Sequence, residues 1–290
     1  QTAKLIKNKR QNIFDHQLQG KKISYNNILD IDSGLDFLNE FNEPTTVIIK
    51  HNNACGVASS KRAKDSFVKA LNSDQKSAFG GVILINRKID KILAKLIKIN
   101  FFEILIAPGF TKEALEILSH KKKLILINSI KISKTKKETS KLVRAGVLSQ
   151  KNNNYKITRK NFNIVSSNNK ISQKKFEDII FAFKVVKHIK SNAIVIVKNK
   201  QTIGIGAGQM NRFDATRIAL IKYKDNFLLK NIVCASDAFF PFVDSLKLLK
   251  KNGCKCIVAP SGSINDKEII EYANKNKLKL IFSSKRVFKH

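Results

Sequence analysis

Short apolar runs alternate with amphipathic stretches along the first third of the chain. The run TTVIIK at residues 45–50 precedes a stretch with helical spacing of apolar positions at residues 61–71. The run GGVILIN at residues 80–86 precedes a similar stretch at residues 90–100. Short apolar runs are typical of buried strands, whereas the longer periodic stretches are typical of amphipathic helices. The alternation therefore predicts an α/β architecture with largely buried strands.

A pattern of strand, loop, helix and strand occurs twice. FEILIAPG is followed by TKEALEILSHKKK and LILIN, and CKCIVAPSG is followed by INDKEIIEYANKNK and LKLIFS. Each copy has Ala-Pro after an apolar strand and Lys-Glu within the helix, and Thr111 is placed to cap the first of these helices. We interpret the two copies as α/β subdomains of related fold and a duplication as their origin. Chance recurrence of a common pattern is the alternative.

The region between the copies, at about residues 130–175, is polar and rich in lysine. It contains KKETSK, SQKNNNYKITRKN and SSNNK. Such composition favours solvated hairpins or a linker over a binding site. We therefore predict a first subdomain at residues 1–150 and a second at residues 151–290, which agrees with a length above the usual size of one domain.

The stretch KHNNACG at residues 50–56 directly follows the first predicted strand. In a parallel α/β sheet, polar residues at the carboxyl end of a strand face the crevice where ligands bind. The ammonium of Lys50, the imidazole of His51 and two amides in this position suit proton transfer and stabilisation of negative charge. The alternative is that Lys50 and His51 face solvent at a strand end and have no functional role.

Three further stretches are candidates for ligand contacts. SAFGG at residues 77–81 lets backbone amides approach a ligand, or simply forms a tight turn. GIGAGQMNR at residues 204–212 follows a predicted hairpin, so it does not match the dinucleotide-binding fingerprint. A glycine-rich stretch followed by an arginine nevertheless suits an anionic ligand. SDAFFPF at residues 236–242 forms either core or a surface on which a flat heteroaromatic ring stacks.

The formal charge of +33 suggests nucleic acid as a partner at first sight. Only eight of the 55 basic residues are arginine, however, and lysine is spread along the whole chain. We find no helix-turn-helix, zinc finger or aromatic nucleic-acid signature. The charge therefore favours attraction of small anions such as a nucleotide phosphate, with a basic nucleic-acid-binding module as the alternative.

The remaining composition indicates a cytoplasmic protein. No run of about 18 uncharged apolar residues occurs, so we expect no membrane partner. The N-terminal residues lack the pattern of a secretory signal. The four cysteines include one C-x-C pair without a second pair to complete a zinc site, so we expect free buried thiols and no metal.

Nine stretches, in this order and over nearly the whole chain, resemble the transformylase domain of the bifunctional purine enzyme with aminoimidazole carboxamide ribonucleotide transformylase and inosine monophosphate cyclohydrolase activities. They are QLQGKKISYNNILD, KHNNACG, AFGG, IAPGF, SNAIVIVKN, IGIGAGQMNR, SDAFFPF, APSGS and RVFKH. The resemblance implies two cytidine-deaminase-like subdomains without zinc, and active sites at a homodimer interface. It also implies transfer of a formyl group from 10-formyltetrahydrofolate to the 5-amine of the ribonucleotide.

The same resemblance implies site residues, position by position. Lys50 and His51 fall on the catalytic pair of the family. The residues that it places at the nucleotide are His51, Gly80, Asn192, Arg212, Phe239 and Arg286, with Glu103 where the family has an acid. Those that it places at the folate are Phe213, Asp244, Ser263 and Ile264.

The beginning of the chain departs from the family pattern. The family has an Arg-Tyr-Gly segment that leads into Asn-Pro-His-Gln, whereas this sequence opens at Gln1-Thr2-Ala3. We therefore expect the upstream cyclohydrolase domain, and an arginine and a tyrosine that bind the nucleotide in the family, to be absent here. Another enzyme of the deaminase-like fold remains an alternative, although the H-x-E and P-C-x-x-C zinc motifs do not occur.

Overall fold

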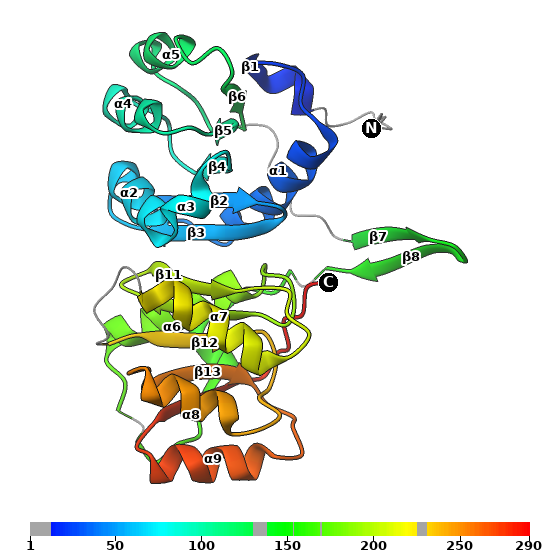
Figure 1. Ribbon diagram of the computed structural model, residues 1–290, viewed down its shortest axis with the longest axis vertical. Coiled ribbons are helices and arrows are strands. Elements are labelled where there is room, and N and C mark those ends of the chain that lie inside the picture. Colours follow the sequence, from blue (N-terminus) through cyan, green and yellow to red (C-terminus); the bar gives the residue numbers. More distant parts are fainter. Residues whose placement is uncertain (1–12, 130–137, 153, 169, 225–230) are drawn as a thin grey trace.

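A computed structural model describes residues 13–129, 138–152, 154–168, 170–224 and 231–290, in which two sets of elements follow one another (Figure 1). The first set is η1 (Ile13–His16), β1 (Gln17–Gln19), α1 (Tyr25–Leu38), β2 (Thr45–Lys50), β3 (Asn53–Ser59), α2 (Ala63–Ser73), α3 (Gln75–Ala78), β4 (Val82–Ile85), α4 (Lys91–Ile99), β5 (Ile104–Ala107), α5 (Lys112–Ser119) and β6 (Ile125–Asn128). The second set is η2 (Arg159–Asn161), β9 (Phe162–Ile164), α6 (Gln173–Val186), β10 (Ile194–Lys198), β11 (Gln201–Gly206), α7 (Arg212–Lys224), β12 (Val233–Ser236), α8 (Asp244–Lys251), β13 (Cys256–Pro260), α9 (Asp266–Lys275) and β14 (Lys279–Ser283). Between the sets lies a separate ribbon of β7 (Glu138–Val143) and β8 (Gly146–Lys151).

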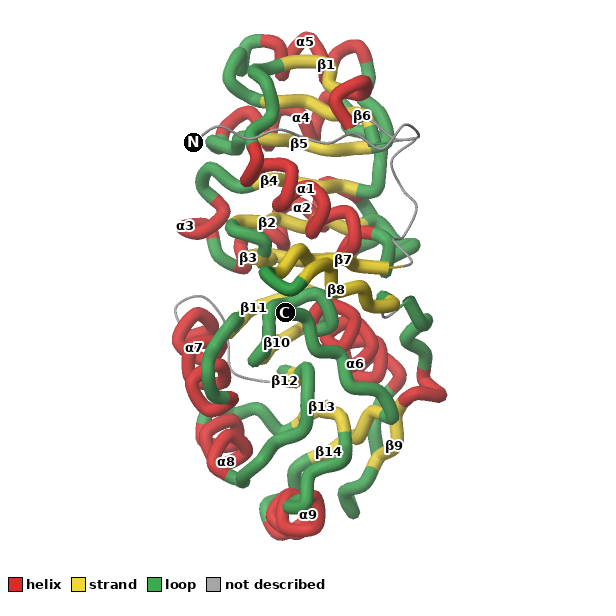
Figure 2. Tube along the Cα trace, turned by 90° about the vertical axis from the view of Figure 1, so that its right-hand side faces the viewer, coloured by secondary structure: helices red, strands yellow, loops and turns green. Residues whose placement is uncertain are grey.

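Twelve of the described strands form one continuous sheet, in the order β1-β6-β5-β4-β2-β3-β11-β10-β12-β13-β14-β9 (Figure 2). Each set contributes three parallel strands, an antiparallel hairpin beside them and a short antiparallel edge strand. The α/β prediction is therefore confirmed. Both predicted copies of strand, helix and strand are present, as β5-α5-β6 and as β13-α9-β14.

The two sets meet where β3 pairs antiparallel with β11. Ala58 lies opposite Gln201, and the Val57 amide donates a hydrogen bond to the buried Thr202 Oγ1 at 2.9 Å. The Ser59 amide donates to the Lys200 carbonyl at 2.9 Å. This seam makes the two halves one sheet.

Helices cover both faces of the sheet. On one face, α1 and α6 pack into a single apolar cluster that spans both halves and includes Phe37 and Phe183. On the other face, α2, α4 and α5 cover the first half, and α7, α8 and α9 cover the second. The predicted cap of α5 is confirmed, because the Ala114 amide donates to Thr111 Oγ1 at 3.2 Å. No helix among the described residues combines the length and hydropathy that a membrane span requires.

The four cysteines are free, as the sequence predicts, and Cys234, Cys254 and Cys256 are buried. Burial raises the pKa of the Cys254 and Cys256 thiols to about 12. These thiols are therefore protonated and unreactive near neutral pH.

A buried charge cluster joins α1 to α6. Glu40 follows α1, and its Oε1 atom accepts hydrogen bonds from Lys187 Nζ at 2.6 Å and His188 Nε2 at 3.0 Å. Burial opposes the charge of Glu40, but His188 and Lys187 outweigh burial and hold its pKa below the usual value. Burial lowers the pKa of His188. At neutral pH we therefore assign a neutral His188 beside an ion pair of Glu40 and Lys187.

We predict that Glu40→Ala lowers the free energy of unfolding by about 3–5 kcal/mol, because it leaves the Lys187 ammonium buried without a counter-ion. Chemical denaturation at pH 7 measures the change. The control is Glu43→Ala, which removes a half-exposed ion pair with Lys200 and costs less than about 1 kcal/mol. Equal losses in the two variants would contradict the assignment.

Candidate functional site

Lys50 and His51 lie at the tip of the hairpin between β2 and β3. Lys50 lies opposite Asn53, so His51 and Asn52 form a two-residue turn, with φ angles of 52° and 62°. Positive φ at both positions is the geometry of a type I′ hairpin turn. The expectation of a parallel strand was wrong, because β2 pairs antiparallel with both β3 and β4. The hairpin tip therefore lies at the amino ends of the parallel strands β4 and β5.

Hydrogen bonds fix this tip against its neighbours. Lys50 Nζ donates to the Phe79 carbonyl at 2.7 Å, immediately before Gly80, whose φ is 72°. The Asn52 amide donates to Asp30 Oδ1 at 2.6 Å. Burial raises the pKa of Asp30, while the Asn52 amide and the His51 charge oppose that shift. The side chain of His51 itself is exposed, so it is available to a ligand.

Glu103 and Gly80 complete this first cluster. Glu103 immediately precedes β5, and its Oε2 atom accepts a hydrogen bond from Asn27 Nδ2 at 2.9 Å. The Gly80 amide donates to the Phe101 carbonyl at 2.9 Å. We define the first cluster as Lys50, His51, Gly80 and Glu103.

A cavity of about 270 Å³ opens beside the first cluster and is lined by both halves of the sheet. Lys50 and His51 line it from the first half, and Gly204, Ile205 and Lys222 line it from the second. Lys222 Nζ contacts Asp74, which also accepts the Ser77 amide hydrogen bond at 3.0 Å. An ion pair from α7 thus fixes the loop that carries Phe79 and Gly80.

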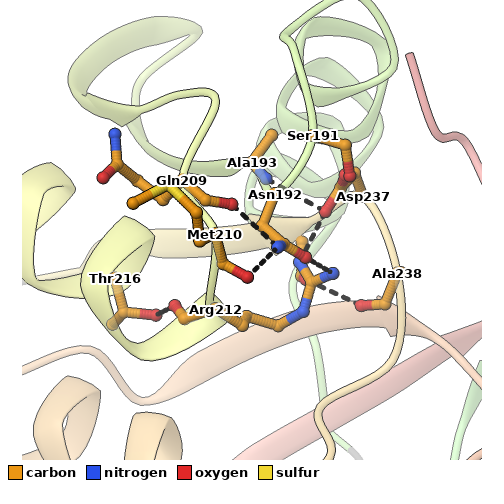
Figure 3. A network of polar contacts seen from close by, with 10 residues as sticks. Ser191, Asn192, Ala193, Gln209, Met210, Arg212, Thr216, Asp237 and Ala238 are labelled. Atoms are coloured by element: carbon orange, nitrogen blue, oxygen red, sulfur yellow. Dashed lines mark hydrogen bonds and ion pairs between the residues drawn. The ribbon is translucent and has the colours of Figure 1, made fainter. Parts of the chain in front are cut away.

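Arg212 lies at the centre of a second, buried network (Figure 3). Its Nη1 atom donates to Asp237 Oδ1 at 2.5 Å and to Ser236 Oγ at 2.8 Å, and its Nη2 atom donates to Asn192 Oδ1 at 2.8 Å. Asn192 Nδ2 donates in turn to the Gln209 carbonyl at 2.8 Å. Arg212 is 7% exposed and Asp237 is fully buried, so this network holds Asn192 in one orientation.

Phe239 and Arg286 lie beside this network. The guanidinium carbon of Arg286 is 5.0 Å from the centroid of the Phe239 ring, and its Nη2 atom donates to the Gly262 carbonyl at 3.3 Å. The Val287 amide donates to the Asp237 carbonyl at 3.1 Å, which brings the end of the chain back to β12. We define the second cluster as Asn192, Arg212, Phe239 and Arg286. Arg286 is its exposed cation.

The four residues expected at the folate lie in α7, at the start of α8 and in the loop after β13. Phe213 follows Arg212 in α7, and Asp244 begins α8. Ser263 and Ile264 lie in the loop after β13, where Asn265 Nδ2 donates to the Pro241 carbonyl at 2.7 Å. Ile264 is 99% exposed and Phe242 is 60% exposed, whereas Phe240 belongs to the core. The aromatic stretch therefore serves both the core and the surface.

All the expected site residues lie at one rim of the sheet, which we call the site rim. It consists of the turn between β2 and β3, the amino ends of β4 to β6 and of β10, and the carboxyl ends of β11 to β14. The nearest strands of the two clusters, β2 and β10, are three strand spacings apart, or roughly 14 Å. Arg212, Phe239 and Arg286 do not line the cavity beside Lys50 and His51.

Sequence reasoning assigned no role to Asp30, Asp74, Lys222 or Asp237. Asp30 and Asp237 lie within stretches that carry the family resemblance. The resemblance therefore indicates these stretches, but it does not indicate the hydrogen bonds of Asp30 to Asn52 and of Asp237 to Arg212. Asp74 could have been recognised as an N-cap three residues before Ser77. No sequence signal indicates its pairing with Lys222, because 147 residues separate the two. Within the glycine-rich stretch at residues 204–212, Gly206 packs against the Ala215 carbonyl of α7.

Among the described residues, no three or more His, Cys, Asp or Glu side chains are grouped to hold a metal ion.

A family model described as the AICARFT/IMPCHase bienzyme matches residues 1–222. The chain belongs to this bienzyme family. It is 47% identical over 275 residues to the bifunctional purine biosynthesis protein PurH of Caldicellulosiruptor saccharolyticus, which covers 94% of the chain and 53% of that protein. Identity to PurH of Fusobacterium nucleatum is 45% over 274 residues, with 94% and 54% covered. The chain spans about half the length of the curated relatives that it matches.

We predict that Asp74→Ala lowers the free energy of unfolding by about 1–2 kcal/mol, because the Ser77 amide loses its cap. Lys222→Met costs less than about 1 kcal/mol, since its ion pair is partly exposed. A double-mutant cycle measured by denaturation should give a positive coupling between the two positions. The control is Asp65→Ala, whose pair with Arg62 lies on the exposed surface. A cycle without coupling would contradict the interaction.

Proposed function

We propose that the chain carries the formyl-transfer activity of a bienzyme of purine biosynthesis. It would move the formyl group of 10-formyltetrahydrofolate to the 5-amine of 5-aminoimidazole-4-carboxamide ribonucleotide, on the way to inosine monophosphate. The observation that carries this proposal is the site rim. The hairpin tip with Lys50 and His51 lies at the same rim as the buried Arg212 network and the exposed Arg286. The chain that carries this rim belongs to the bienzyme family.

His51 is the general base in this proposal. The acceptor amine is a poor nucleophile, because its lone pair is delocalised into the imidazole and the adjacent carboxamide. A base that removes its proton during attack typically supplies a factor of about 10²–10⁴ in rate. Lys50, held on the Phe79 carbonyl, would stabilise the oxyanion of the tetrahedral intermediate. The intermediate collapses by breaking the bond between the formyl carbon and the folate N10, and that nitrogen takes up a proton and leaves as tetrahydrofolate.

The second cluster suits the nucleotide in charge and shape. Arg286 offers an exposed guanidinium to an anion, and the Phe239 ring supports it. The Arg212 network orients the Asn192 amide, which can hydrogen-bond to a heterocycle. Phe213, Asp244, Ser263 and Ile264 provide a partly apolar surface next to it for the folate. Gly80 and Glu103 would contact the nucleotide from the first cluster.

The active unit in this proposal is a homodimer with two shared sites. In one chain the nearest strands of the two clusters are roughly 14 Å apart along the rim, whereas both substrates must meet within one crevice for transfer. A second copy can place its first cluster opposite the second cluster of its partner. Within each chain, we propose that residues 1–150 and 151–290 are two cytidine-deaminase-like subdomains that need no zinc. The cytoplasm is the compartment we propose.

We predict that His51→Asn lowers kcat for formyl transfer by about 10²–10⁴ while substrate affinity changes little. Asparagine tolerates the positive φ of this turn position, so the hairpin is retained. A spectroscopic assay of folate deformylation with the ribonucleotide measures the change, on this chain and on one extended upstream. The control is His120→Ala, an exposed histidine at the end of α5. Near-normal turnover of His51→Asn would overturn the role of His51.

Mixing of two inactive variants tests the shared site. Co-expressed His51→Asn and Arg286→Ala chains should recover about a quarter of the normal activity, because half of the dimers are mixed and each mixed dimer has one intact site. If both residues served a site within one chain, every mixed dimer would lack an intact site. Activity would then stay at the level of the separate variants.

A further inference from the structure

The helix α7 extends from the second cluster to the cavity beside the first. Its first residue, Arg212, lies at the centre of the buried network of the second cluster. Its eleventh residue, Lys222, lines the cavity together with Lys50. Ten steps of α-helix separate Arg212 from Lys222, or about 15 Å, which is similar to the spacing of the two clusters along the rim. A single helix of the second half therefore carries one charged side chain to each cluster.

Lys222 holds the short helix α3 of the first half. Its Nζ atom contacts Asp74 Oδ2 and donates to Ser77 Oγ at 3.2 Å. Asp74 is the N-cap of α3, and it accepts hydrogen bonds from the Ser77 amide at 3.0 Å and from Ser77 Oγ at 2.7 Å. Burial opposes the charge of Asp74, but Lys222 and Ser77 outweigh burial and hold its pKa below the usual value. Lys222 and the start of α3 thus form one hydrogen-bonded group.

The end of α3 determines where the Lys50 ammonium lies. The helix ends at Ala78, and the carbonyl of the next residue, Phe79, accepts the hydrogen bond of Lys50 Nζ at 2.7 Å. A lysine side chain has a long, flexible stem, so it keeps one position only where an acceptor holds it. Displacement of α3 would therefore displace the acceptor of Lys50.

The charges around the cavity assign different roles to its two lysines. Asp74 compensates the charge of Lys222, and all three of Lys50, Asp74 and Lys222 line the cavity. No other carboxylate is among the described residues that line it, so the charge of Lys50 is left without a counter-ion there. A negative charge that develops on the formyl oxygen would thus be stabilised by Lys50, whereas Lys222 is already engaged.

We propose that Lys222 is a positioning residue for formyl transfer. It acts through Asp74 and α3 on the Phe79 carbonyl, and that carbonyl holds the Lys50 ammonium where the oxyanion of the intermediate forms. The bonds that form and break are those of the proposed transfer, and Lys222 takes no part in them. This inference rests on the proposed function and adds to it a residue that acts without contact to either substrate.

Steady-state kinetics of formyl transfer test this role. Lys222→Met should lower kcat by about 10- to 100-fold, because displacement of a catalytic group costs a factor of this order. The KM values of both substrates should change less than about threefold, since Lys222 contacts neither substrate. Lys222→Arg can still pair with Asp74, so it should recover most of the rate. The matched control is Lys76→Met, which removes the same charge from an exposed position on α3 and should keep the normal kcat.

A double-mutant cycle with Lys50 separates positioning from a general structural effect. Lys222→Met should lower kcat in the chain that has Lys50, but it should change kcat less than about twofold in Lys50→Met, because the group that it positions is then absent. A loss of equal size in both backgrounds would overturn the proposal. A normal kcat in Lys222→Met, or a raised KM as its single change, would do the same.

The acetylation rate of Lys50 tests the same contact without catalysis. Trace acetylation with acetic anhydride, followed by mass spectrometry of the peptides, measures how readily each lysine reacts. Lys50 should react about 2- to 10-fold faster in Lys222→Met, because its ammonium loses a hydrogen-bond acceptor, and at an unchanged rate in Lys76→Met.

The two assays distinguish failure of the positioning role from failure of the proposed function. Equal acetylation rates of Lys50 in Lys222→Met and in the unchanged chain would contradict positioning, whatever the kinetics show. An unchanged chain that transfers no formyl group, even when extended upstream, would contradict the function. Faster acetylation of Lys50 in that case would still show that Lys222 holds the Lys50 ammonium in place.

Discussion

The antiparallel pairing of β3 with β11 is the constraint on which the rest of this structure depends. It joins two sets of elements of the same order into one sheet, and it reverses the direction of the second set relative to the first. The site rim therefore carries the amino ends of the parallel strands β4 to β6 from one half, and the carboxyl ends of β12 to β14 from the other. The amino ends of the parallel strands in one half and the carboxyl ends of those in the other half therefore lie at the same rim.

This reversal gives the two repeated hairpins different positions relative to the site rim. The turn between β10 and β11 has the same geometry as the turn at His51, with φ angles of 51° and 54° at Asn199 and Lys200. Asp178, the sixth residue of α6, accepts hydrogen bonds from both turn amides, as Asp30, the sixth residue of α1, accepts one from Asn52. The seam places the second turn at the opposite rim, so only the turn with the histidine adjoins the site.

The sequence predicts the elements better than their assembly. Apolar runs, Thr111 and the repeated Ala-Pro strands are local signals, and the structure follows them at β2, α5, β5 and β13. The tight turn at His51 and Asn52, with positive φ at both residues, makes β2 antiparallel to β3. The expectation of a parallel strand did not take this turn into account. The seam between β3 and β11 and the pair of Asp74 and Lys222 join residues far apart in the sequence. No local pattern records such contacts.

Burial separates the roles of the two arginines in the second cluster. Arg212 is enclosed with Asp237, which neutralises its charge, so the pair contributes little field at the surface. A buried pair of this kind gives no assurance of extra stability, because desolvation offsets the attraction between its charges. Its clear structural effect is orientation, since the guanidinium bonds Asn192, Ser236 and Asp237 at once. Arg286 is exposed over Phe239, so the positive charge that this cluster presents to solvent is that of Arg286, while Arg212 fixes the Asn192 amide.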